Sequence, residues 1–330
     1  MLRRSFVQGL LGVGAGGLSR AQTPAPAAAR GAGRRLAVLL FDGPQPWSFL
    51  PLELRPALAE LGWDEGRNLS VQWHYAHGDA GRLEALALQL AHSGVDAILT
   101  RGTPATRALA RATSTVPILT GLGDPVGSGF AKSFAVPGGN ITGISYAIRE
   151  TSRKQLELLR VMVPTLAMLV IVLPADRAPF AGELTRQMLA AAKESELPTR
   201  IVMAADSEEL RTGLRSSSTS TARAAFVFGF GSTIEPKTLV EIALSSRMPT
   251  MFELPVYVSA GGLMSYRLYW ENQALRTAAQ IDKVFRGEKP AQIPFEQPTR
   301  SELVINRSTA KALGLTIAPS LLVRADEIVG

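Results

Sequence analysis

Polar residues that follow predicted strands are the main candidates for chemistry in this chain. The segment 100–105 (TRGTPA) ends a buried strand, turns at Gly102 and begins a helix, with Thr103 as the N-cap and Pro104 at the first helical position. The first N–H groups of a helix bind carboxylates and phosphates, because they lack acceptors within the helix and carry the positive end of its dipole. Arg101 adds a guanidinium suited to a bidentate carboxylate contact. The alternative is that Thr103 only caps the helix and Arg101 faces water.

Two more loops in the first half of the chain are candidates for the same site. Asp42 and Gly43 follow the first strand, where a glycine lets backbone N–H groups approach a ligand. Trp47, in the same loop, is suited to stack on a flat or cationic ligand, or alternatively to pack at the edge of the domain. Asp124 follows the fourth strand. It either pairs with an ammonium group or caps a helix, since an aspartate before a proline is a common cap.

The second half of the chain supplies a matching set of candidates. Phe230 and Ser232 follow one predicted strand, and Glu253 follows the next. They offer an apolar wall, a hydrogen-bond donor and a partner for an amine. Tyr266 ends a later strand and either closes over a ligand or packs at a hinge.

The composition excludes several kinds of catalytic centre. The 330 residues include no cysteine, which rules out disulfides, thiolate metal sites and a cysteine nucleophile. His74 and His77 form an H-x-x-H pair, but a strand exit does not place both rings on one face, so no metal site is predicted. The chain also lacks a G-x-S-x-G elbow after a strand and a phosphate loop with lysine. We therefore predict no catalytic residue and no cofactor.

The net charge of +7 comes from 35 basic and 28 acidic residues. Six of the arginines and none of the acids lie in residues 1–35, which leaves +1 for the rest of the chain. A nucleic-acid partner would require a basic patch on the folded part, so no nucleic-acid binding is predicted.

The N-terminus is typical of an export signal. Arg3 and Arg4 precede an apolar run over 6–18, and small residues at Ser19 and Ala21 predict cleavage near Ala21. The run is too short to span a bilayer. The paired arginines favour a twin-arginine signal, with an ordinary secretory signal as the alternative. We expect residues 1–21 to be removed, residues 22–35 to form a flexible tether, and the mature protein to be periplasmic.

Apolar runs that alternate with amphipathic segments predict two α/β halves. Strands are predicted over 36–41, 69–75, 95–100, 117–120, 167–173, 199–203, 224–228, 250–252 and 263–266. Helices are predicted over 51–61, 81–91, 103–112, 150–162, 180–194, 207–216, 236–245, 273–285 and 308–313. This order indicates a doubly wound parallel sheet in each half. Ligands of such sheets bind beyond the carboxyl ends of the strands.

The chain resembles the ABC-transporter substrate-binding protein family of the tryptophan/tyrosine type, which has the type I periplasmic-binding-protein fold. Ordered strings carry the resemblance: LAELGW (58–63) with EGRN (65–68), RGTPA (101–105), GDPVGSG (123–129), PGGNITG (137–143), AGGLMSY (260–266), EQPT (296–299), and VIN (304–306) with ALGL (312–315). Two positions depart from the family pattern. Arg101 replaces a small residue, which indicates a more acidic ligand, and Gly229 replaces an acidic or amide residue.

The resemblance implies two lobes joined by a three-crossing hinge near 143–146, 262–266 and 296–304. The N-terminal lobe would comprise 36–145 plus 264–298, and the C-terminal lobe 146–263 plus 299–330. The function implied is that of a monomeric periplasmic component of an ABC importer. It would bind an amino acid or related carboxylate between the lobes and dock on a membrane permease. A sensory protein that serves a signalling partner and a hydrolase that uses the same cleft are the alternatives.

Overall fold

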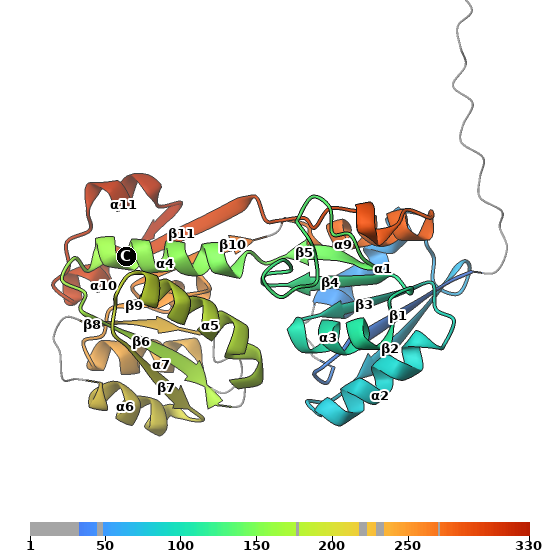
Figure 1. Ribbon diagram of the computed structural model, residues 1–330. Coiled ribbons are helices and arrows are strands. Elements are labelled where there is room, and N and C mark those ends of the chain that lie inside the picture. The colour runs from blue at the N-terminus through green and yellow to red at the C-terminus, as the bar shows by residue number, and fades with distance from the viewer. Residues whose placement is uncertain (1–32, 45–48, 176–177, 218–222, 229–233, 270) are drawn as a thin grey trace, which may run out of the picture. The chain divides into compact units, whose positions relative to one another are not determined.

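The computed structural model describes residues 33–44, 49–175, 178–217, 223–228, 234–269 and 271–330 (Figure 1). Their strands form two sheets, one of five strands and one of seven. The predicted signal 1–21 and nearly all of the predicted tether lie outside the described residues. Within the described ranges, no helix combines the length and the apolar character needed to cross a membrane.

The first lobe is built on the five-stranded sheet, with strand order β2-β1-β3-β4-β5. All four pairings in it are parallel. Its strands are β1 (Arg34–Leu40), β2 (Leu69–Tyr75), β3 (Ala97–Arg101), β4 (Ile118–Leu122) and β5 (Ile141–Ser145). Its helices are α1 (Phe49–Glu60), α2 (Ala80–Ala91), α3 (Thr103–Ala112) and α9 (Gln273–Phe285). A short 3-10 helix, η2 (Pro290–Gln292), lies beside β5.

Alternating side chains of the strands face two separate apolar cores. On one face, residues such as Leu36 pack with Leu58 of α1 and Ile281 of α9. On the other, residues such as Ile98 pack with Leu83 of α2 and Leu109 of α3. Helices therefore cover both faces, as the near-continuous apolar strands predict for a parallel sheet.

The first strand begins before the predicted end of the tether. Arg34 and Arg35 belong to β1, where Arg34 forms a 2.6 Å ion pair with Asp96 and donates to the carbonyl of Phe285. Arg35 donates to the carbonyl of Ser93. The tether boundary at residue 35 was therefore wrong, because both arginines belong to β1, where Arg34 forms an ion pair with Asp96 and Arg35 donates to a backbone carbonyl. Only four arginines precede β1, so the net charge from Arg34 to the end is +3, compared with +1 for residues 36–330.

The second lobe is built on the seven-stranded sheet, with strand order β12-β11-β10-β9-β8-β6-β7. Its strands are β6 (Met168–Pro174), β7 (Thr199–Ala204), β8 (Arg223–Val227), β9 (Thr250–Phe252), β10 (Met264–Tyr269), β11 (Arg300–Asn306) and β12 (Glu327–Val329). Its helices are α4 (Ile148–Met162), α5 (Ala178–Glu194), α6 (Ser207–Ser216), α7 (Pro236–Ser245), α8 (Val256–Ser259), α10 (Arg307–Ala312) and α11 (Pro319–Arg324).

Two strands at one edge of this sheet depart from the predicted parallel order. Strand β11 is antiparallel to β10, with Tyr269 opposite Arg300, and β12 is parallel to β11. The chain leaves the sheet after Tyr269 and re-enters it at Arg300, which is the same end, so β11 must run backwards. The other strands are parallel as predicted.

The chain passes between the two sheets three times. It does so after Ser145 of β5, after Tyr269 of β10 and before Arg300 of β11. Residues 264–269 were predicted to lie in the first lobe, but their hydrogen bonds to β9 and β11 place them in the second sheet. The middle crossing therefore follows Tyr269 instead of falling within 262–266.

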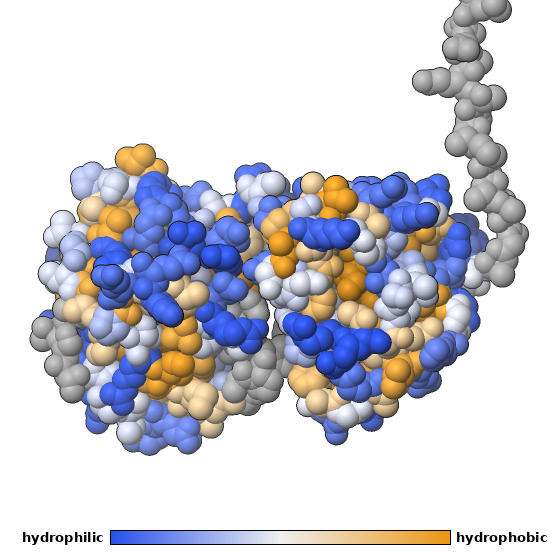
Figure 2. Space-filling view, viewed as in Figure 1, coloured by the Kyte–Doolittle hydropathy of each residue, from blue (hydrophilic) through white to orange (hydrophobic). Residues whose placement is uncertain are grey.

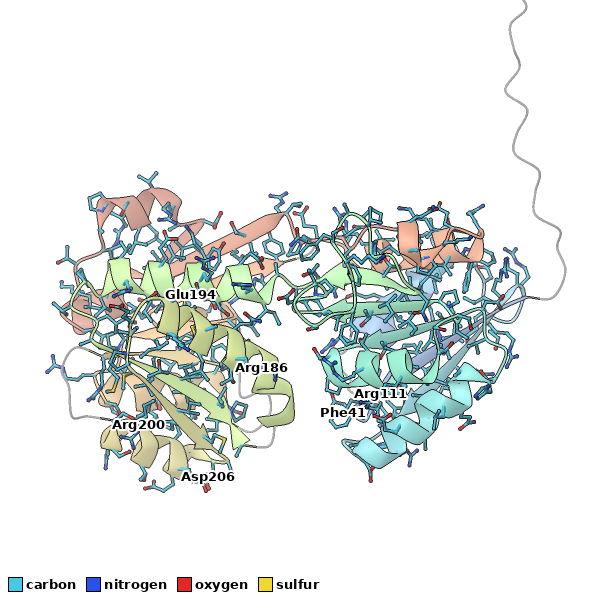
Figure 3. All side chains as sticks on the ribbon, in the orientation of Figure 1. Phe41, Arg111, Arg186, Glu194, Arg200 and Asp206 are labelled. Atoms are coloured by element: carbon cyan, nitrogen blue, oxygen red, sulfur yellow. The ribbon has the colours of Figure 1, made fainter. Side chains whose placement is uncertain are left out.

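Helix α4, which follows the first crossing, has a charged outer surface. Arg149 and Arg153 of α4 lie 3.6 and 3.3 Å from the carboxylate of Glu194 at the end of α5, which Figure 3 labels. Hydrophilic residues accordingly gather over α4 in Figure 2. The buried face of α4 is tied to the sheet by Gln155, whose amide donates to the carbonyl of Tyr266 at 2.7 Å.

Candidate functional site

A small hollow of about 10 Å³, with room for about one water molecule, lies at the carboxyl edge of the first sheet, where β3, β4 and β5 end beside the start of α9. Its lining residues are Leu99, Thr100, Arg101, Leu119, Thr120, Gly121, Gly143, Ile144, Tyr146, Gln273, Thr277 and Gln280. A ligand of a parallel α/β sheet is expected at this edge. The hollow therefore combines the predicted location with hydroxyl, amide and guanidinium groups.

The start of α3 differs from the prediction in one residue. Gly102, with φ +83°, is the N-cap, and Thr103 is the first helical residue, so the assignment of Thr103 as the cap was wrong. A positive φ suits glycine, which has no Cβ to clash with the backbone. The N–H of Gly102 donates to the carbonyl of Gly121 at 2.9 Å, and the Thr106 hydroxyl donates to the carbonyl of Gly102. These bonds fix the turn against β4.

The helix that follows this turn keeps unsatisfied donors. No side chain caps α3, and Pro104 has no N–H. The N–H groups of Thr103 and Ala105 have no acceptor among the residues that the structure describes. Arg101, the last residue of β3, is exposed, and in the described part of the chain no group accepts a hydrogen bond or forms an ion pair with its guanidinium. This end of α3 is therefore available to an anion.

Helix α9 and the first crossing complete the hollow with residues that sequence reasoning missed. The amide of Gln273 donates to the hydroxyl of Tyr146 at 3.2 Å. Gln280 is buried and donates to the carbonyl of Gly143 at 3.0 Å. The Thr277 hydroxyl is buried and has no partner in the described structure. Tyr146 follows a strand near a predicted crossing, which is a usable signal. Gln273 and Thr277 reach the hollow only through the return of α9 to the first sheet.

The other candidates of the first lobe lie at the same sheet edge but outside the hollow. Asp42 and Gly43 follow β1, and a Cβ added to Gly43 would lie 3.1 Å from Nδ1 of His77. Asp124 accepts a hydrogen bond from the N–H of Gly127 at 2.8 Å. This bond supports the turn-capping alternative for Asp124. Trp47 lies outside the described residues.

Of the second-lobe candidates, the structure describes Glu253 and Tyr266. Phe230 and Ser232 lie outside the described residues. Glu253 follows β9 and is partly buried. Tyr266 is 9% exposed and belongs to the apolar core of the second lobe, where burial raises the pKa of its phenol. This position supports the packing alternative for Tyr266.

The two histidines of the H-x-x-H motif differ in burial, and the burial of His74 affects its pKa. His74 lies on β2, its Nε2 atom is buried without a partner in the described structure, and burial lowers its pKa. His77 is exposed, with φ +53°. In the described part of the chain, no group of three or more His, Asp or Glu side chains is arranged to hold a metal ion.

We expect the protein to lose stability on acidification partly through His74. An unfolded histidine titrates near pH 6.5. Below that pH the unfolded chain binds a proton that the folded chain resists, so the free energy of unfolding falls as the pH falls. Urea unfolding at about pH 7.5 and pH 5 should show a smaller loss for His74→Phe than for the wild type. His77→Asn, which tolerates the positive φ, should retain the wild-type loss. Equal losses for the wild type and His74→Phe would contradict the assignment.

One protein family matches most of the chain. The sequence profile of the family described as ABC transporter substrate binding protein matches residues 53–329. A tyrosine-binding protein from Clostridioides difficile (strain R20291) is 23% identical over 261 residues, which are 78% of this chain and 74% of that protein.

Solved structures show the same fold. The ABC domain from Streptococcus pneumonia in complex with L-Trp has a TM-score of 0.68 at 24% identity, covering 90% of this chain and 100% of that one. A conserved domain protein from Vibrio cholerae also has a TM-score of 0.68, at 23% identity, covering 89% and 99%. The ligand-free, open form of a substrate binding protein with adhesive properties from Clostridium difficile has a TM-score of 0.62 at 20% identity, covering 90% and 99%.

These similarities confirm the predicted fold class of two α/β lobes with parallel sheets of the periplasmic-binding type. Because the family profile spans most of its length, the chain belongs to the family of ABC transporter substrate-binding proteins.

Proposed function

We propose that this protein is the periplasmic solute-binding component of an ABC importer. In this proposal it binds an amino acid or related carboxylate with an aromatic side chain between its two lobes and delivers it, unaltered, to a membrane permease. It acts as a monomer and needs no cofactor. The observation that carries the proposal is the carboxyl edge of the first sheet, where the small hollow lined by Arg101 lies beside unsatisfied N–H groups at the start of α3. Family membership and the relatives named for tyrosine and tryptophan support the same class of solute.

The proposed mechanism is differential contact with the two lobes. A ligand shifts an open–closed equilibrium only if it binds one state more tightly than the other. A solute that contacts both lobes binds the closed state more tightly, because its contacts with the second lobe exist only when the lobes are closed. The permease would then recognise the closed form. No covalent step is required of any residue.

Ligand binding should raise the melting temperature of the purified full-length chain. A ligand at 100 times its Kd adds about 2.7 kcal/mol to the free energy of unfolding, which corresponds to a rise of roughly 5–10 °C for lobes of this size. The panel comprises L-tyrosine, L-tryptophan, L-phenylalanine, their desamino acids, other amino acids and short peptides. Chromatography of the recovered ligand should show it unchanged. Consumption of the ligand, or the absence of a shift throughout the panel, would contradict the proposal.

A further inference from the structure

The described lining of the hollow carries positive charge and no negative charge. Among its described lining residues, Arg101 is the only charged side chain, and neither aspartate nor glutamate is present. Helix α9 begins at the hollow with Gln273, and α3 begins two residues after Arg101; in neither helix does a side chain cap the N-terminus. Each helix start carries roughly half a positive charge. The described lining of the hollow therefore carries positive charge and no acidic side chain, whereas Asp42 and Asp124 lie outside it at the same sheet edge.

A buried hydroxyl provides a second, independent sign of a ligand. Thr277 is only 6% exposed, lines the hollow and has no hydrogen-bond partner for Oγ1. A threonine within a helix commonly bonds to the carbonyl four residues earlier, and this hydroxyl does not. An unsatisfied buried hydroxyl is costly unless a ligand or water completes it. Thr277 is thus placed to donate to an acceptor in the hollow.

We infer that this hollow selects the carboxylate of the solute and that Arg101 is the specificity-determining residue. This inference rests on the proposed function and narrows its substrate class. Arg101 offers a planar pair of donors to the carboxylate, while the Thr103 N–H and the Thr277 hydroxyl complete the set of donors. None of the described residues that line the hollow is acidic, so the hollow itself offers no partner for an ammonium group. An aromatic carboxylic acid without an amino group therefore binds about as tightly as the corresponding amino acid.

Matched ligands separate the two charged groups of the solute. The phenol series consists of L-tyrosine, 3-(4-hydroxyphenyl)propionate, L-tyrosinamide and tyramine. L-tryptophan, 3-(indol-3-yl)propionate and tryptamine form an indole series. In calorimetric titrations of the full-length protein, we expect each desamino acid to bind within about threefold of its amino acid. We expect tyramine, tryptamine and tyrosinamide to bind at least tenfold more weakly, because a charged hydrogen bond contributes about that factor.

Variants at Arg101 test the residue itself. Arg101→Gln should weaken carboxylate binding by about tenfold to a hundredfold and leave amine binding within about twofold. Arg101→Lys should fall between, because it keeps the charge and loses the bidentate geometry. Arg111→Gln is the matched control. It removes the same charge from the last turn of α3, at Arg111, which Figure 3 labels. Arg111 pairs with Glu84, and the variant should bind as the wild type does. Thr277→Val should weaken the carboxylates by several-fold, while Thr277→Ser restores binding.

Three results would overturn the inference. Tight binding of tyrosine without binding of its desamino acid would show that an ammonium is required, and would leave the proposed function intact. An unchanged carboxylate affinity in Arg101→Gln would remove Arg101 as the determinant, again without touching the proposed function. Failure of the wild type to bind any ligand in either series would contradict the inference, whereas the proposed function is judged by the wider thermal panel.

Discussion

Replacing Gly143 by alanine should unfold the first lobe under conditions in which the wild type is fully folded. Gly143 is in β5 with φ +150°, and a Cβ there would lie 1.9 Å from the carbonyl oxygen and 2.6 Å from the nitrogen of Thr120. Both atoms belong to the backbone of β4, which cannot move without breaking the β4–β5 ladder. Overlap of this kind belongs to the most damaging class of substitutions, on the order of 4–5 kcal/mol. This loss is a large share of the free energy of unfolding of a typical domain, which is roughly 5–15 kcal/mol.

Urea unfolding followed by circular dichroism measures this loss, and hydrogen exchange of β4 and β5 locates it. The matched control is Gly139→Ala. Gly139 lies in the exposed loop before β5, has no positive φ, and a Cβ there would meet nothing within 4 Å. That variant should unfold within about 0.5 kcal/mol of the wild type. Wild-type stability in Gly143→Ala would mean that β5 does not pair with β4 as described.

The second large effect is expected in the other lobe, at Phe226. This side chain is 2% exposed in the middle of β8, and its ring meets that of Phe228 edge-on with centroids 4.7 Å apart. In the ladders its residue lies opposite Ile171 of β6 and Met251 of β9. Phe226→Ala removes a ring from a closed apolar core and should lower the free energy of unfolding by about 3–5 kcal/mol.

The free energies of unfolding of two further variants serve as references for Phe226→Ala. Phe226→Leu keeps most of the volume and should cost only about 1–1.5 kcal/mol. Val323→Ala removes an apolar side chain that is 86% exposed on α11 and should change stability by less than about 0.5 kcal/mol. Equal costs for Phe226→Ala and Val323→Ala would place Phe226 outside the core.

The repeating elements of the fold could be predicted because their signals are local. Helices α6, α7 and α9 begin and end at the predicted residues, since each has an amphipathic period and flanking breakers. Strand β5 was predicted only as part of a crossing. Gly143 weakens its strand signal, and the strand exists because β4 provides its ladder. The reversed direction of β11 and the presence of the short strand β12 likewise depend on where the chain re-enters the second sheet. No local sequence pattern predicts that point.

The candidate site was predictable in part for the same reason. Arg101 and Gly102 adjoin the end of a strand, so the rule that ligands bind at carboxyl ends found them. The neighbours of Arg101 in the hollow come from elsewhere, because Tyr146 follows β5 and Thr277 lies on α9. The role of Asp124 depended on a bond to Gly127 that only coordinates reveal. Sequence patterns therefore locate the strand ends. The residues that surround them depend on the packing of α9, which is distant in the sequence, and cannot be predicted locally.

The return of α9 to the first sheet has a consequence for the order in which the protein can mature. Strand β1 occupies an inner place in its sheet, yet one face of it is sealed by Ala278 and Ile281, which lie more than two hundred residues later in the chain. In a nascent polypeptide that has emerged only as far as β10, Leu36 and Leu58 can pack on each other but lack their contacts with α9. The core of the first lobe, which is synthesised first, is therefore completed only when α9 packs on it. Part of its apolar surface stays exposed until most of the chain has been synthesised.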